Sequence, residues 1–450
     1  MRSIARVDSG SDYSTYSTLP EGAVSGAAPE TVGGVVIGGD YQGLGIARSL
    51  GRHGIPVCVV DDETSIARAS RFVQTAVRVR DLRTEASLLS ALAQTRDRLD
   101  SARWVLYPTR DETVAALAAN REALLSDFRV PVPGMAAISQ AWDKRETYRL
   151  AARLSIPIPR TWFPATEADL ASVDGDGPFV IKPAIKEHFF YATGAKAWRA
   201  DTRTELAAVF RRAAGIAGSG EVIIQELIPG GGGEQYAYCA FFRQGQAVAS
   251  MTVRRRRQHP SDFGRASTYV ETVSVGELAA PSIRFLRAIG YYGLIELEYK
   301  RDPRDGQYKL LDVNARTWGY HTLGQAAGVD FPYLLFRDQM GAPVEEVHAR
   351  PGVRWIRLAT DVPNAVRDIR AGTLRPGDYL RSLRGVDTEA VFSFRDPLPS
   401  CYEIALLPYL AFKRGLLPAE MRGNRCLKRR IPLASSTTSA SRTPCGREPP

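Results

Sequence analysis

The residues best suited to chemistry in this sequence lie between Tyr292 and Gly319, in a predicted β-hairpin. Two alternating apolar runs, Leu294–Tyr299 and Tyr308–Val313, flank a turn with Asp, Pro and Gly, which is the pattern of a hairpin with a longer loop. Residues two positions apart on a strand share a face. Two pairs at this spacing therefore place oxygen atoms on one surface, and they are Glu296 with Glu298 and Asp312 with Asn314.

Three carboxylates and an amide on one buried sheet surface are costly, because the acids repel one another and lose water unless a cation holds them. Ligands that offer only oxygen suit Mg²⁺, which also keeps water and accepts phosphate oxygens. The hairpin therefore predicts a site for a divalent cation. The alternative is a solvated hairpin face that carries ordinary surface acids.

Length and composition indicate a globular protein of more than one domain. The chain has 450 residues, with 44% hydrophobic and 24% charged residues. Its net charge is +10, and the excess is concentrated at Arg254–Arg257 and between Lys413 and Arg430. This distribution suits anionic ligands or a local acidic surface better than a nucleic-acid footprint over the whole protein.

Cysteine usage and hydropathy bear on the compartment. The five cysteines are scattered and form no CxxC pair, so the sequence indicates neither a disulfide framework nor a zinc site, and a reducing cytoplasm is expected. The N-terminal residues contain no apolar segment of the signal-peptide type. No apolar run reaches the roughly 20 residues that span a bilayer, and Ile404–Leu417 is at most a short interfacial helix.

The first third of the chain is predicted to be a Rossmann-like domain. The strand Val35–Ile37, the turn Gly38–Gly45 with a helix, and the strand Pro56–Val60 form a doubly wound unit. The glycines of this turn do not supply G-x-G-x-x-G, which makes NAD binding the weaker interpretation. Asp111 follows a later strand, where it either faces a ligand or caps a helix.

Several ordered motifs between Ala141 and Gly341 resemble the ATP-grasp superfamily, of the carboxylate–amine ligase type that includes carbamoyl-phosphate synthase and D-aspartate ligase-like proteins. The resemblance implies an α/β chain, α+β in the grasp part, in which a Rossmann-like preATP-grasp domain precedes the ATP-grasp domain and a small C-terminal extension. The expected segments are a flexible tail (1–32), a preATP-grasp domain (33–135), an ATP-grasp domain (136–345), a C-terminal extension (346–421) and a disordered basic tail (422–450).

The resemblance assigns roles in nucleotide binding. Lys144 and Lys182 match the two lysines that contact phosphates in that family, and a triphosphate attracts such mobile point charges. Lys186 is expected to touch the phosphates from a flexible flap. The backbone connector that reads adenine, and the acid that holds the ribose hydroxyls, are matched by the following residues: Gln225, Glu226, Leu227, Ile228 and, for the ribose, Glu234.

The same resemblance assigns the metal and the reacting groups. Glu298, Asp312 and Asn314 match its ligands for Mg²⁺, with Mn²⁺ as an alternative, and the role of Glu296 stays open. Arg316 matches the arginine that faces the transferring phosphate, and Lys182 is expected to assist. The run Arg254–Arg257 is interpreted as an anion clamp, with Arg257 as its catalytic member.

Two features depart from the family pattern. The loop Ala184–Gly194 has few glycines, yet Lys186–Lys196 is still expected to be the flexible flap over the phosphates, with Lys196 as a further candidate for phosphate contact. The alternative is that the aromatic residues of this loop belong to the core. Asp312 stands where glutamate is commoner. A second basic loop is expected at Arg254–Gly264.

The implied function is ligation: ATP activates a carboxylate as an acyl phosphate, and an amine takes it, with release of ADP and phosphate. The predicted partners are small acids and amines, with no specific nucleic acid, and a homodimer is left open. The alternative function is a nucleotide-responsive binding protein held to nucleic acid or an anionic membrane by its basic segments. The sequence leaves the acid and the amine unidentified.

Overall fold

The computed structural model describes residues 31–99, 103–259, 264 and 266–413. The chain forms two compact units, of which the first ends at Tyr402 and the second begins at Glu403. Apart from residues 31 and 32, the tail predicted at 1–32 lies outside the described residues, as does the tail predicted at 422–450. The boundaries predicted at 135 and 345 stay predictions, because both fall inside the first unit.

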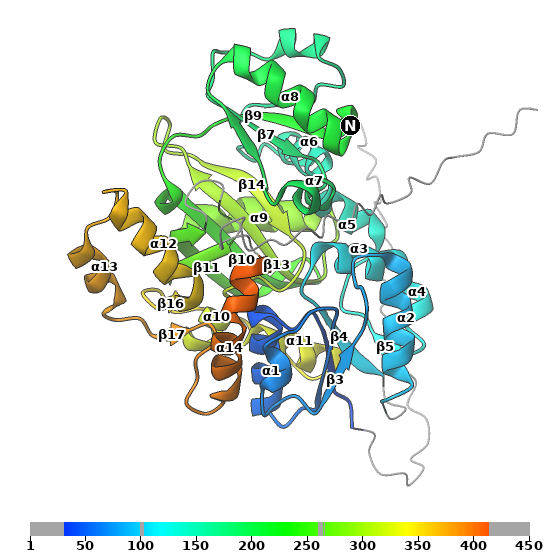
Figure 1. Cartoon of the computed structure of the whole chain (residues 1–450). Helices are drawn as coiled ribbons and strands as arrows, with labels where there is room; N and C mark the ends of the chain where they lie inside the picture. Colours follow the sequence, from blue (N-terminus) through cyan, green and yellow to red (C-terminus); the bar gives the residue numbers. More distant parts are fainter. Residues whose placement is uncertain (1–30, 100–102, 260–263, 265, 414–450) are drawn as a thin grey trace, which may run out of the picture. The chain divides into compact units, whose positions relative to one another are not determined.

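The first sheet is parallel and has five strands in the order β3-β2-β1-β4-β5. Its strands are β1 (Gly34–Ile37), β2 (Val57–Asp61), β3 (Thr75–Arg78), β4 (Trp104–Pro108) and β5 (Phe128–Arg129). Four helices belong to this segment, and they are α1 (Tyr41–Arg52), α2 (Glu85–Arg96), α3 (Asp111–Ala119) and α4 (Arg121–Leu124). The sheet appears with α1 and α2 in Figure 1, and it confirms the Rossmann-like prediction.

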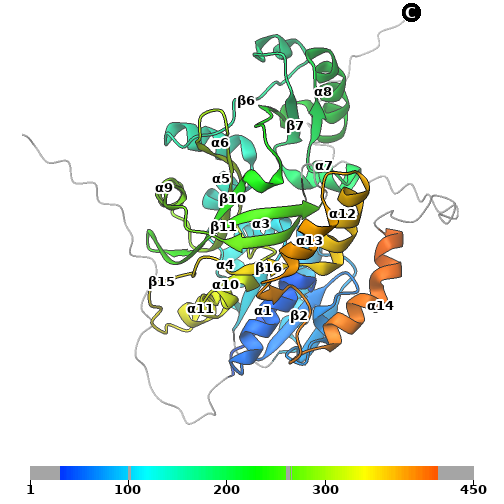
Figure 2. The same cartoon turned by 90° about the vertical axis from the view of Figure 1, so that its left-hand side faces the viewer.

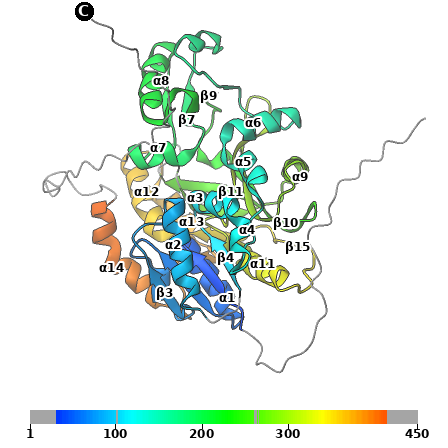
Figure 3. The same cartoon turned by 90° about the vertical axis from the view of Figure 1, so that its right-hand side faces the viewer.

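A four-stranded sheet follows, in the order β6-β9-β7-β8. Its strands are β6 (Thr161–Trp162), β7 (Phe179–Pro183), β8 (Trp198–Ala200) and β9 (Val222–Glu226). The helices of this segment are α5 (Met135–Trp142), α6 (Lys144–Arg153), α7 (Lys186–Thr193) and α8 (Arg203–Ala217). Figure 3 shows α8 beside β7 and β9, and these elements enclose an apolar core around Phe179, Phe210 and Ile224.

The third sheet has eight strands, with the path β14-β13-β10-β11-β12-β16-β17 and β15 paired to β11. Its strands are β10 (Gln235–Arg243), β11 (Gln246–His259), β12 (Ala266–Thr272), β13 (Gly293–Arg301), β14 (Tyr308–Asn314), β15 (Val347–His348), β16 (Arg354–Ile356) and β17 (Thr388–Glu389). Figure 2 shows β10 and β11 as long neighbouring strands. The predicted hairpin is confirmed, because β13 and β14 pair antiparallel.

The remaining helices follow the third sheet or connect its strands. They are α9 (Ala279–Ala288), α10 (Thr322–Ala326), α11 (Phe331–Gln339), α12 (Leu358–Arg370), α13 (Pro376–Leu383) and α14 (Leu398–Lys413). One apolar core contains residues of both the first and the third sheet, such as Leu106 and Ile295. Among the described residues no helix is long and apolar enough to cross a membrane.

Two predicted loops are wrong. Ala184–Gly194 contains the helix α7, whose Phe189 is buried against Trp198 with ring centroids 4.6 Å apart and anchors the segment to the core. The expected basic loop begins inside β11, which continues to His259 because it pairs with β12. Both segments are therefore regular structure where they approach the site.

Candidate active site

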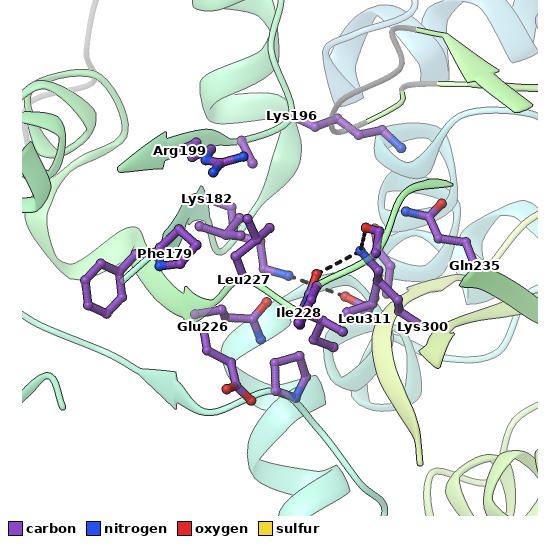
Figure 4. A pocket seen from close by; sticks show the side chains of 18 of the residues that line it. Phe179, Lys182, Lys196, Arg199, Glu226, Leu227, Ile228, Gln235, Lys300 and Leu311 are labelled. Atoms are coloured by element: carbon purple, nitrogen blue, oxygen red, sulfur yellow. Dashed lines mark hydrogen bonds between the residues drawn. The ribbon is translucent and has the colours of Figure 1, made fainter. Parts of the chain in front are cut away.

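A cavity of about 600 Å³ is lined by residues of the four-stranded and eight-stranded sheets. Its volume lies in the range of small-molecule and cofactor sites. Many of the predicted nucleotide-binding and metal-binding residues line it, and they are Lys144, Lys182, Lys186, Gln225, Glu226, Leu227, Ile228, Glu298 and Asp312. Figure 4 shows Glu226 and Leu227 on one side of the cavity and Gln235 and Lys300 on the other.

Five lysines line this cavity, of which Lys300 holds the connector described below and the other four come from different elements. Lys144 is the first residue of α6 and pairs with Asp312, while Lys182 on β7 contacts the Tyr148 hydroxyl and lies 3.4 Å from the Leu311 carbonyl oxygen. The other two are Lys186, at the start of α7, and Lys196, before β8. These four ammonium groups, beside that of Lys300 in the same cavity, favour a polyanion such as a triphosphate.

The charge of the Lys182 side chain depends on pH near neutrality. Burial, together with the charge of Lys144, lowers its pKa to about 7. Above that pH the free protein loses this charge, so nucleotide binding at pH 8 is expected to take up a proton as the phosphates restore it. Calorimetry in buffers of different ionisation enthalpy counts the proton. Lys182→Met should abolish the uptake, and binding by the unaltered protein at pH 8 without uptake contradicts the assignment.

The connector after β9 is fixed through its backbone. The Leu227 amide donates to the Pro178 carbonyl oxygen at 3.0 Å, and Lys300 Nζ donates to the carbonyl oxygens of Ile228 (2.9 Å) and Gly230 (2.8 Å). Gln225 is buried and donates to Thr161 Oγ1 at 2.8 Å. A rigid connector whose backbone groups lie at the cavity wall is suited to bind the edge of a flat heteroaromatic ring.

The two predicted acids of this region are placed differently. The Glu226 carboxylate is engaged by protein groups rather than placed to bind a ligand, because it accepts from the Arg160 amide at 3.0 Å and pairs with Arg304 at 3.0 Å. Glu234 follows Gly232, which lines the cavity, but its own carboxylate pairs with Arg254 at 3.3 Å and does not line it. The structure therefore does not bring the predicted ribose-binding acid into the cavity.

The hairpin acids meet as the sequence spacing predicts. Glu298 lies opposite Asp312 and Glu296 opposite Asn314 in the strand register. The Asn314 amide donates to Glu298 at 2.9 Å and to Glu296 at 3.0 Å, so it bridges the two glutamates. Glu296 is also bound by the Tyr320 hydroxyl, and burial, with the neighbouring charge of Glu298, raises its pKa to about 7.

The donor set on this hairpin fits Mg²⁺. Burial alone would raise the pKa of Asp312, but the charges of Lys144, Lys196 and Lys182 lower it below its ordinary value, so the acid is ionised. Two carboxylates and an amide oxygen on paired strands supply what Mg²⁺ needs beside phosphate oxygens and water. In the described part of the chain no group of three or more His, Cys, Asp or Glu is suited to a metal, so the site depends on this mixed set.

Arg316 connects the hairpin to the first sheet. Its Nη2 donates to Asn314 Oδ1 at 3.2 Å, and its Nε lies 2.7 Å from Asp111 Oδ1 at the start of α3. Asp111 also pairs with Lys186. A small adjoining cavity of about 20 Å³ is lined by Asp111, Lys186 and Asn314, so Arg316 is next to the predicted metal ligands, as its assignment requires.

The arginine run is divided by a break in strand pairing. Arg255 lines the cavity and pairs with Glu298 at 3.1 Å. Arg257 does not line the cavity, and it pairs with Asp361 of α12 through two contacts of 2.8 Å. The register of β11 against β12 shifts between these two arginines, and such an irregularity redirects a side chain. The structure therefore does not bring Arg257, the predicted catalytic arginine, to the cavity, and Arg255 is the member of the run that it places there.

The corrected placement predicts different outcomes for the two arginines. Arg257→Ala leaves the fully buried Asp361 without its partner, so the free energy of unfolding should fall by about 3 kcal/mol. Thermal or urea unfolding measures this loss, and the folded variant should retain ATP turnover. Arg255→Ala should instead reduce turnover with a smaller change in stability. Loss of turnover in folded Arg257→Ala would restore the first assignment.

Two further residues at the site, Tyr148 and Lys300, carry no assigned role from the sequence, and for a third, Asp111, the sequence leaves ligand binding and helix capping open. Tyr148 lies four residues after Lys144 and so on the same helix face, a spacing that is visible in the sequence. It contacts Lys182. Lys300 secures the connector, and Asp111 pairs with Lys186 and Arg316. The partners of Lys300 and Asp111 lie between 70 and 205 positions away in the sequence, so only the fold reveals these contacts.

Comparisons with known proteins bear on the family and the enzyme class. Residues 233–360 match the family described as "ATP-grasp in the biosynthetic pathway with Ter operon". The D-aspartate ligase of Enterococcus faecium is 22% identical over 296 residues, covering 63% of this chain and 70% of that protein. The resemblance to ATP-grasp proteins is confirmed, and the relative is a ligase, which is the predicted enzyme class.

Solved structures share the fold. The L-amino acid ligase of Bacillus licheniformis has a TM-score of 0.54 at 16% identity, covering 70% of this chain and 75% of that one. The biotin carboxylase domain of Hydrogenobacter thermophilus 2-oxoglutarate carboxylase, solved with MgADP, ADP and bicarbonate, has a TM-score of 0.55 at 12% identity, covering 72% and 74%. The predicted fold class is confirmed.

Proposed function

We propose that this chain, an ATP-grasp protein by fold and by sequence similarity, is an ATP-dependent ligase that joins a carboxylic acid to an amine. One observation carries the proposal: a cavity with five lysines faces a hairpin whose acids are paired in register. Lysines that can bind phosphates and oxygen atoms that can bind Mg²⁺ are thereby present in one cavity. The enzyme class of the ligase relative supports the same chemistry.

The chain's own residues suit the first chemical step. A carboxylate oxygen of the acid attacks the γ-phosphorus of ATP, the bond to the bridging oxygen of ADP breaks, and an acyl phosphate forms. Lys144 and Lys182 neutralise the phosphate charge, and Arg316 faces the transferred group. Mg²⁺, when held by Glu298, Asp312 and Asn314, supplies further charge neutralisation and orientation.

The second step needs no enzyme nucleophile. The amine attacks the acyl carbon, the carbon–oxygen bond to phosphate breaks, and the amine loses a proton as the amide forms. Arg255 lies beside Glu298 and is placed to bind the departing phosphate or the acid's carboxylate. Positioning and electrostatics supply most of the rate in such a site.

Trapping the intermediate tests this function. With Mg-ATP and single amino acids, release of phosphate should require the acid, and hydroxylamine should yield the corresponding hydroxamate. Adding pairs of amino acids should identify the amine. Nucleotide hydrolysis that is independent of every acid, with no hydroxamate, contradicts the proposal.

A further inference from the structure

Helix α12 (Leu358–Arg370) exposes an apolar face and buries a polar one. Leu358, Val362 and Val366 are 41%, 41% and 40% exposed. They are spaced four residues apart, so they form one line along the helix. Asp361 and Asn364 lie on the buried side, with exposures of 0% and 3%. This is the reverse of the usual surface helix, which turns its apolar stripe to the core.

The polar face is fixed in place, so the helix cannot turn to hide its apolar line. Asp361 binds Arg257 through two contacts of 2.8 Å, and Asn364 donates to the Gln258 carbonyl oxygen at 3.0 Å. Arg257 is also stacked between the rings of Tyr269 (4.4 Å) and Tyr379 (5.1 Å), and the latter belongs to α13. Exposure of the line is therefore set by buried ionic contacts.

The neighbouring helix adds another exposed aliphatic side chain, and both helices carry positive charge. Figures 1 and 2 both show α12 and α13 (Pro376–Leu383) side by side, and Leu380 of α13 is 62% exposed. From 366 to 384 the chain has five arginines against two aspartates. All five arginines are exposed, and they are Arg367, Arg370, Arg375, Arg381 and Arg384.

We propose that α12 and α13 dock on an anionic lipid surface through their exposed aliphatic residues and arginines, which we call the α12–α13 face. Exposed aliphatic side chains together with exposed arginines are the pattern of helices that lie in a membrane interface, where the aliphatic side chains enter the acyl boundary and the guanidinium groups meet the headgroups. Nucleic acid would use the arginines but leaves the aliphatic line without a partner, since single strands are bound by stacking on aromatic rings. The charge excess favours an anionic surface over a second copy, which carries the same charge.

Vesicle sedimentation with the full chain tests the proposal. Binding is expected to vesicles containing roughly one-third phosphatidylglycerol and not to phosphatidylcholine alone, and it should weaken with salt. The triple change Leu358→Ser, Val362→Ser and Val366→Ser should reduce the bound fraction about tenfold. Arg370→Gln with Arg375→Gln should reduce it at low salt.

Matched controls separate this face from the rest of the protein. Ile216→Ser and Arg211→Gln change exposed residues of α8 and should bind vesicles as the unaltered chain does. ATP-dependent phosphate release by the triple variant shows that it is folded. All variants keep the same C-terminal residues, so a difference in binding between them is not caused by that segment. Equal binding by the triple variant overturns the proposal, as does self-association through this face in gel filtration without retention on vesicles.

Discussion

Replacing Asp312 by Asn is expected to lower ATP turnover by about a thousandfold, or about 4 kcal/mol in the activation barrier. The change removes one of two carboxylates in the predicted metal site while keeping size and shape. It also leaves Lys144 without its ionic partner, which should cost about 1–3 kcal/mol of folding stability and leave the fold intact. Phosphate release and circular dichroism measure the two effects.

A carboxylate on the same hairpin provides the control for this change. Asp305 lies in the exposed turn between β13 and β14 and pairs with Lys309. Asp305→Asn should keep full turnover. If Asp312→Asn were as active as Asp305→Asn, the metal assignment would be lost, and with it the proposed role of the hairpin.

Lys182→Met should lower kcat/KM for ATP by about a hundredfold to a thousandfold, about 3–4 kcal/mol. The lysine comes from the strand β7, and its hydrogen-bond partners among the described residues are the Tyr148 hydroxyl and the Leu311 carbonyl oxygen, both neutral. Methionine fills similar space, and burial already disfavours the charge, so stability should change by about 1 kcal/mol or less. Steady-state kinetics with varied ATP separates the loss from a folding defect.

An exposed cation of the neighbouring helix serves for comparison. Arg153 is the last residue of α6 and is exposed. Arg153→Met should leave kcat/KM unchanged. An equal loss in both variants would indicate a general effect of charge rather than a contact with the phosphates.

The hairpin could be predicted because its signals are local, whereas most residues of the cavity were assigned by the resemblance to ATP-grasp proteins. Alternation places Glu298 and Asp312 on facing strands, and register follows from the turn. The site around Arg257 could not be predicted, because an irregularity in β11 pairing leaves no mark in a run of four identical residues. The helix α7 was missed for a similar reason: its Phe189 packs on Trp198, a contact that depends on tertiary structure.

Glu234 illustrates another limit of sequence reasoning. Its spacing from Glu226 agrees with the family pattern, yet an arginine twenty positions later holds its carboxylate away from the cavity. Local pattern gives the backbone path, whereas competition between charged partners decides where a side chain ends.

The division of apolar cores has a mechanical consequence. The first and third sheets share one core, whereas the four-stranded sheet with α8 has its own. Hinge motion is cheapest where few apolar contacts cross. We therefore expect the lobe formed by the four-stranded sheet and α8 to swing as a rigid clamp during each catalytic cycle, opening for substrates and closing over them, while the remainder serves as its base.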